Sequence, residues 1–85
     1  MKYTYRIFED NAGNLHLAVL SEGKCVYYLT DSDRGFVLDT LDAFKNGGDP
    51  ISDYWEGGED DPEACYHEII RFEEANNGSA FELSL

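Results

Sequence analysis

The stretch that decides the fold is residues 3–30, which read YTYRIFEDNAGNLHLAVLSEGKCVYYLT. Side chains of different character alternate along it with a period of two, the pattern typical of β-strands. Residues 11–14 and 22–24 interrupt the pattern with Asn and Gly, which tolerate the positive φ angles of tight reversals. The stretch therefore predicts three antiparallel strands joined as a meander.

The side chains of the predicted middle strand alternate between its two faces. The residues of one face are Leu15, Leu17 and Val19. The residues of the other are His16, Ala18 and Leu20. The flanking strands add four tyrosines, which are Tyr3, Tyr5, Tyr27 and Tyr28. This number of tyrosines indicates that the second face of the sheet is not fully polar, so we expect a monomer or a weak homodimer.

A first helix is predicted directly after the meander. Asp31-Ser32-Asp33 offers side-chain oxygens that can cap the free N–H groups of a helix start. Apolar residues follow at i, i+1, i+4 and i+7 and form one stripe, which is Val37, Leu38, Leu41 and Phe44. The glycines of Asn46-Gly47-Gly48 are typical of a helix end.

A second helix is predicted to start at Asp61-Pro62, with Asp as the cap and Pro in the first helical position. Its apolar stripe is Cys65, Ile69 and Phe72, and Asn76-Asn77-Gly78 ends it. Residues 79–85 alternate again and predict a terminal strand.

The predicted order of elements is βββααβ. A chain of 85 residues is long enough for one domain, here residues 1–85. The fold class is α+β, a three-stranded antiparallel meander followed by two helices and a C-terminal strand. We expect both helices to cover one face of the sheet.

Negative charge is concentrated in the second half of the chain. Residues 1–45 hold seven acids and five bases, whereas residues 46–85 hold eleven acids and one base, Arg71. The densest part runs from Asp53 to Glu63 and contains no base. Such clustering costs the folded state through self-repulsion. Either the acids meet a basic surface on a partner, or the charge only keeps the protein dispersed.

The predicted partner-binding residues lie in this acidic segment. Tyr54 and Trp55 stand between acids, the composition of an aromatic interface anchor inside a charged rim. The alternative is that Trp55 folds back into the core, because a small core needs its one large indole. The predicted set is Asp53, Tyr54, Trp55, Glu56, Glu59, Asp60 and Glu63.

No catalytic residue, metal ligand or cofactor is predicted. His16, Cys25, Cys65 and His67 could supply zinc-binding atoms, but Cys65 and His67 are two apart on a helix and cannot chelate one ion. The spacing of an EF-hand is absent around Glu59-Asp60-Asp61 and Glu63, so a solvated acidic loop is expected there, with a weak cation site as the alternative. No serine lies in a nucleophile-elbow pattern and no Gly-rich phosphate loop precedes a helix, so we do not expect an enzyme.

The sequence also bears on location and on the classes of partner. No apolar run approaches the roughly 18 residues of a transmembrane span, and residues 1–5 lack the apolar stretch of a signal peptide. We therefore expect a cytoplasmic protein in which Cys25 and Cys65 are reduced, buried thiols. A net charge of −12 is repelled by anionic membranes and by bare nucleic acid, so the expected partner is a basic nucleic-acid-binding protein.

The run Ala43-Phe44-Lys45-Asn46-Gly47 closes a predicted helix after a meander and leads through acids to a second helix that contains a Tyr. This order resembles the small acidic anti-CRISPR proteins of the type II-A class, which phages and prophages carry. The chain is also similar in size and character to small acidic proteins of conjugative elements. In the anti-CRISPR class, acidic residues imitate DNA phosphates and occupy the site where the effector nuclease reads a short duplex motif.

The resemblance implies that Asn46 and Gly47 match the turn and that Glu59, Asp60, Asp61 and Glu63 occupy the charged stretch. Unlike that class, this chain has no predicted N-terminal helix and carries Trp55 in a longer loop. The hypothesis is an inhibitor that mimics nucleic acid and blocks a CRISPR effector, a restriction enzyme or a similar protein. The alternatives are an immunity or antitoxin protein that neutralises a basic toxin, and an acidic interaction module without phosphate mimicry.

Overall fold

The computed structural model describes residues 3–53, 55–75 and 80–83. The elements, in chain order, are β1 (Thr4–Asp10), β2 (Leu15–Ser21), β3 (Lys24–Asp31), α1 (Arg34–Lys45), α2 (Pro62–Ala75) and β4 (Ala80–Leu83). The predicted α+β class, with its antiparallel meander followed by two helices, is confirmed. Within the described part of the chain, no helix is both long enough and apolar enough to cross a membrane.

The meander forms where the alternating pattern predicted it. β1 pairs antiparallel with β2, and β2 pairs antiparallel with β3, with an irregularity between Val19 and Leu20. Glu22 and Gly23 adopt φ angles of 53° and 82°, so the tight reversal between β2 and β3 has the positive angles that its sequence suggested. The sheet order is β3-β2-β1-β4, in which β4 lies antiparallel to β1. The predicted strand over 79–85 includes Ser79, Ser84 and Leu85, which lie outside the described residues.

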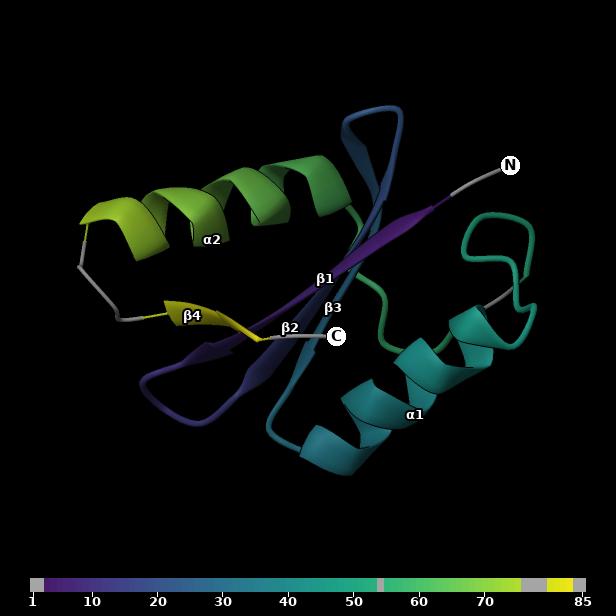
Figure 1. Ribbon diagram of the computed structural model, residues 1–85, viewed down its shortest axis with the longest axis horizontal. Coiled ribbons are helices and arrows are strands. Elements are labelled where there is room, and N and C mark those ends of the chain that lie inside the picture. The colour runs from purple at the N-terminus through teal and green to yellow at the C-terminus, as the bar shows by residue number, and fades with distance from the viewer. Residues whose placement is uncertain (1–2, 54, 76–79, 84–85) are drawn as a thin grey trace.

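The helices lie on opposite faces of this sheet. Figure 1 shows the strands nearly edge-on, with α2 on one side and α1 on the other. The prediction that both helices cover one face is therefore wrong. The physical reason lies in the strands, since β1, β2 and β3 bury apolar side chains on both faces and each face needs a cover.

The face under α1 is a continuous apolar core. Its buried residues are Ile7, Leu15, Leu17, Val19, Tyr27, Leu29, Val37, Leu41 and Phe44. The ring of Phe44 lies at its centre, 5.1 Å from the ring of Tyr27 and 4.5 Å from that of Trp55 between centroids. Trp55 thus packs from the α1–α2 connection onto this core.

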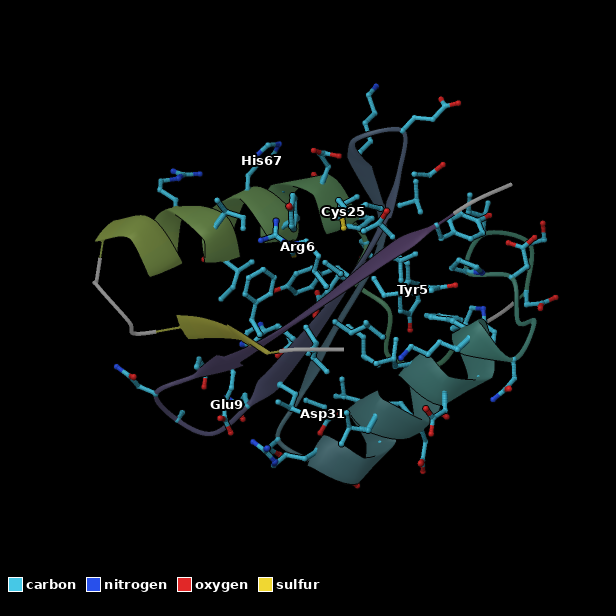
Figure 2. The ribbon with its side chains drawn as sticks, viewed as in Figure 1. Tyr5, Arg6, Glu9, Cys25, Asp31 and His67 are labelled. Atoms are coloured by element: carbon cyan, nitrogen blue, oxygen red, sulfur yellow. The ribbon has the colours of Figure 1, made fainter. Side chains whose placement is uncertain are left out.

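The face under α2 is smaller and more polar. Its buried residues are Phe8, Ala18, Leu20, Cys25, Tyr28 and Ile69. Arg6 lies on this side as well, with its guanidinium over the rings of Phe8 and Tyr66 at 5.1 and 5.6 Å and a hydrogen bond to the Tyr66 hydroxyl. Figure 2 shows how neighbouring Tyr5 and Arg6 point to opposite sides of β1.

Both predicted helix caps are present. The Asp33 side chain accepts a hydrogen bond from the N–H of Phe36, and the Asp61 side chain accepts one from the N–H of Ala64 at 3.1 Å. Gly47 has a φ of 112°, the left-handed conformation that ends a helix and that its sequence predicted.

The apolar stripes are confirmed in part. Val37, Leu41 and Phe44 are buried in α1, but Leu38 is 43% exposed, so its predicted burial is wrong. The fourth buried residue of α1 is Thr40. Its hydroxyl can be buried because it donates a hydrogen bond to the Phe36 carbonyl instead of to water. In α2, Ile69 is buried and Cys65 is half-buried, whereas the side chain of Phe72 lies outside what the structure describes.

Candidate functional site

The acidic segment Asp53–Glu63 links the two faces of the sheet, and we call it the acidic crossover. It leaves the α1 face after Trp55, passes the edge strand β3 and reaches the α2 face at the start of α2. Figure 1 shows this connection running behind the strands from the α1 side to the α2 side. The opposite placement of the helices therefore decides where the acids lie.

Two glycines allow the acidic crossover to lie directly against the sheet. A Cβ atom at Gly58 would stand 2.7 Å from Cε2 of Tyr27, and one at Gly57 would stand 3.1 Å from Cδ1 of Leu29. Directly after them, the backbone N–H of Glu59 donates to the carbonyl of Tyr28 at 2.8 Å. Larger residues would hold the chain off the sheet, so the glycine pair fixes its path.

The end of the acidic crossover is anchored to the α2 face. Asp61 caps α2 with both its side chain and its carbonyl, which accept from Ala64 and Cys65. The Glu63 carboxylate accepts a hydrogen bond from the backbone N–H of Cys25 at 2.8 Å and lies 2.8 Å from Nε2 of His67. Acids in the first turn of a helix also interact favourably with its dipole, so these two carboxylates stabilise the fold.

The remaining carboxylates of the acidic crossover are not used in this way. Glu56, Glu59 and Asp60 are exposed, and among the described residues none of these side chains has a cation within ion-pairing distance. Asp53 is also exposed, but its carboxylate accepts from the N–H of Asp49 at 3.1 Å and holds a turn. Within the acidic crossover, the described carboxylates that serve neither an ion pair nor a turn or helix start are therefore those of Glu56, Glu59 and Asp60.

The predicted aromatic anchor has a different position. Tyr54 lies outside the described residues. Trp55 is half-buried, its Nε1–H donates to the carbonyl of Asp49 at 2.7 Å, and its ring fills the space over Gly48, where an added Cβ would meet it at 2.7 Å. Of the two alternatives that the sequence left open for Trp55, these contacts match the core alternative.

The candidate metal ligands are not brought together. Among the described residues, no group of three or more His, Cys, Asp and Glu side chains could hold a metal ion. Cys25 and Cys65 are free thiols, the first buried and the second half-buried. His67 lies on α2, as Figure 2 shows, and contacts Glu63 rather than either cysteine.

The structure also contains a constellation that the sequence did not predict. His16 lies between Asp10 and Tyr28, with its Nε2 2.8 Å from the Asp10 carboxylate and its Nδ1 2.7 Å from the Tyr28 hydroxyl. Since an ionised carboxylate can only accept, Nε2–H donates to Asp10; in the neutral ring Nδ1 then accepts from the Tyr28 hydroxyl. The sequence offered one clue, because the period of two places His16 and Tyr28 on the same face of adjacent strands.

Burial and hydrogen bonding shift the pKa values of several groups around this constellation. Burial opposes the ionisation of Asp10, but hydrogen bonds from His16, Asn14 and Ala12 outweigh it, and the pKa of Asp10 lies below its ordinary value. Burial raises the pKa of Tyr28 above its usual range. Burial, followed by the neighbouring acids, also raises the pKa of the Cys65 thiol. Tyr28 and Cys65 thus stay protonated at neutral pH, the weakly nucleophilic form.

Comparison with protein-family models, with curated proteins and with solved structures found no match to this chain.

Proposed function

We propose that the protein is an acidic inhibitor that binds the basic surface of a nucleic-acid-handling protein through its acidic crossover. The supporting observation is that Glu56, Glu59 and Asp60 are exposed and, among the described residues, unpaired, on a backbone that is fixed on both sides. A CRISPR effector or a restriction enzyme is the class of partner that fits a nucleic-acid mimic.

The charge of Glu56, Glu59 and Asp60 is both free and pre-positioned for a partner. A protein that reads nucleic acid gains much of its affinity by neutralising a dense row of phosphates with Lys and Arg. A single exposed ion pair contributes only about 0.2–1 kcal/mol, so a mimic needs several carboxylates that act together. Contacts of Gly58 with Tyr27 and of Glu59 with Tyr28 hold the backbone in place, which lowers the entropy lost when these side chains meet a partner.

The test compares two triple variants with the same change in net charge. The first reverses the free acids, with Glu56→Lys, Glu59→Lys and Asp60→Lys. The control reverses exposed acids elsewhere, with Glu22→Lys, Asp39→Lys and Asp42→Lys. Glu63 is left unchanged because it accepts the N–H of Cys25, and its reversal would disturb the fold.

Wild-type and variant proteins are used as baits in the native host, and the recovered partner is then tested with labelled duplex DNA and RNA. We expect the crossover variant to lose the partner, the control variant to keep it, and wild-type protein to displace nucleic acid from it. Equal binding by both variants would show that the acids only disperse the protein. A partner that binds through the acids but keeps its nucleic acid would instead favour an immunity or antitoxin role.

A further inference from the structure

A cavity of about 390 Å³ lies between the sheet and α2. Its walls on the sheet side include Ala12, Tyr28 and Thr30, and α2 contributes Cys65, Glu68 and Ile69. The volume is in the range of roughly 300–1,000 Å³ that small-molecule sites occupy. The cavity is thus large enough for a small organic ligand.

One wall of the cavity carries a polar group held in a fixed position. Tyr28 is only 3% exposed, and its hydroxyl is fixed by His16, which Asp10 fixes in turn. When His16 is neutral and accepts the Tyr28 proton, the Tyr28 oxygen keeps lone pairs that can accept a further hydrogen bond. Asp10, His16 and Tyr28 have low exposure, and leaving such groups without hydrogen bonds would be costly. Because they hydrogen-bond one another, this wall of the cavity is well ordered.

Two other polar side chains of the cavity can also accept hydrogen bonds from a ligand. The Glu68 carboxylate is exposed at the cavity and has no cation beside it among the described residues. The Thr30 hydroxyl has no hydrogen-bond partner within the described part of the chain. No Lys or Arg is among the residues found to line the cavity, so its charge is negative.

We propose that this cavity binds a small organic cation that combines an apolar ring with one protonated amine. The ring would contact Tyr28, Ile69 and Cys65, and the ammonium group would donate to the oxygens of Tyr28 and Thr30 and face the Glu68 carboxylate. An aromatic face next to a carboxylate also favours a cation over a neutral or anionic molecule of the same shape. Among the described residues, the cavity shares no lining side chain with the acidic crossover, which meets the cavity through backbone hydrogen bonds of Glu59 to Tyr28 and of Cys65 to Asp61.

The experiment uses three probes of one size: 2-phenylethylammonium, neutral 2-phenylethanol and anionic phenylacetate. Each is titrated into the isotopically labelled full chain, and amide chemical shifts give both the affinity and the position of the site. We expect saturable shifts at Ala12, His16, Thr30 and Ile69 for the cation, with at least tenfold weaker binding of the alcohol and none of the anion. Equal affinity for the three probes, shifts confined to other residues, or no saturable binding would overturn the proposal.

Variants separate a specific site from general attraction to an acidic protein. Glu68→Gln removes the carboxylate at the cavity and should weaken binding of the cation at least fivefold while leaving that of the alcohol unchanged. Glu56→Gln makes the same charge change on the acidic crossover and should alter the affinity less than twofold. Tyr28→Phe keeps the ring and removes the hydroxyl oxygen, so it should also lower the affinity for the cation. Equal losses for Glu68→Gln and Glu56→Gln would show non-specific binding and overturn the proposal.

Discussion

The two faces of the sheet differ in what their side chains contribute. The α1 face is an apolar core around Phe44, closed by Trp55. The α2 face has fewer buried apolar residues and holds Arg6, the Asp10–His16–Tyr28 constellation and a cavity. Since hydrophobic burial supplies most of the driving force for folding, the α1 face carries the larger share of stability. The α2 face is then free to hold polar groups that a tightly packed core would exclude.

The largest loss of stability is expected when a buried side chain of the α1 face is truncated. Leu41→Ala removes a side chain that is 4% exposed in the core, and should cost about 2–5 kcal/mol of unfolding free energy. Leu38→Ala, three residues earlier and 43% exposed, is the matched control and should stay within about 0.5 kcal/mol. Denaturant unfolding measures both, and equal losses would contradict the assignment of these two positions.

The connection between the faces gives the second prediction. Gly58→Ala forces a Cβ to 2.7 Å from Cε2 of Tyr27, whose ring Phe44 contacts on the α1 face. The strain of such overpacking is about 1–3 kcal/mol, measured by the same unfolding experiment.

Gly35→Ala is the control for this change. Its Cβ would lie 3.4 Å from the nearest atom, an Asp33 oxygen, in ordinary contact. It should stabilise the protein by about 0.4–1 kcal/mol, because Ala restricts the unfolded chain. A Gly58→Ala variant as stable as wild type would show that the acidic crossover does not lie against Tyr27.

Two neighbouring tyrosines should respond to the same substitution with opposite signs. The hydroxyl of Tyr27 is buried on the α1 face and has no partner among the described residues, so Tyr27→Phe should stabilise the protein by up to about 1 kcal/mol. Tyr28→Phe breaks the hydrogen bond to His16 on the other face and should cost about 0.5–1.5 kcal/mol. Thermal unfolding distinguishes the two, and shifts of the same sign would contradict the difference between the faces.

The last prediction concerns pH. Burial raises the pKa of Cys25 on the α2 face from 9.0 to about 11. The folded state thus favours the neutral thiol, whereas the unfolded chain ionises first as pH rises. The stability that this thiol contributes is complete below pH 9 and is lost as pH rises through about 11.

Cys25→Val tests this contribution, since it keeps the backbone N–H that donates to Glu63. The stability of wild type relative to Cys25→Val should decline between pH 9 and 11. Parallel pH profiles for the two proteins would show that the thiol is not held neutral.

The sequence predicted the strands, turns and helix caps because each depends on local chemistry. Asp33 and Asp61 cap their helices with their own side chains. Gly23 in the β2–β3 turn and Gly47 at the end of α1 adopt positive φ angles. The face that each helix covers is a tertiary property, since a helical stripe does not say which side of a sheet it will meet. The apolar residues on both faces of β2 carried that information, but the prediction did not use it.

The contacts of the candidate-site residues could not be predicted from the sequence, for the same reason. Glu63 and Glu59 are both acids near a helix start, and only the fold shows that Glu63 accepts from Cys25 while the side chain of Glu59 is free. Asp10, His16 and Tyr28 come from two strands and a strand end, so their contact depends on the register of the sheet. The sequence shows where charges lie along the chain, but it does not show which charged side chains make contacts that stabilise the fold.

The path of the acidic crossover along β3 has a consequence for how copies of the protein behave toward one another. β3 is an edge of the sheet, and an uncovered edge offers N–H and C=O groups on which a second chain can extend the sheet and start an aggregate. Here the backbone N–H of Glu59 already donates to the carbonyl of Tyr28, and Glu59 and the next residue, Asp60, are exposed acids. Two copies that met along this edge would bring like charges together and displace a hydrogen bond. The charge that a basic partner would neutralise therefore also opposes edge-to-edge growth of the sheet.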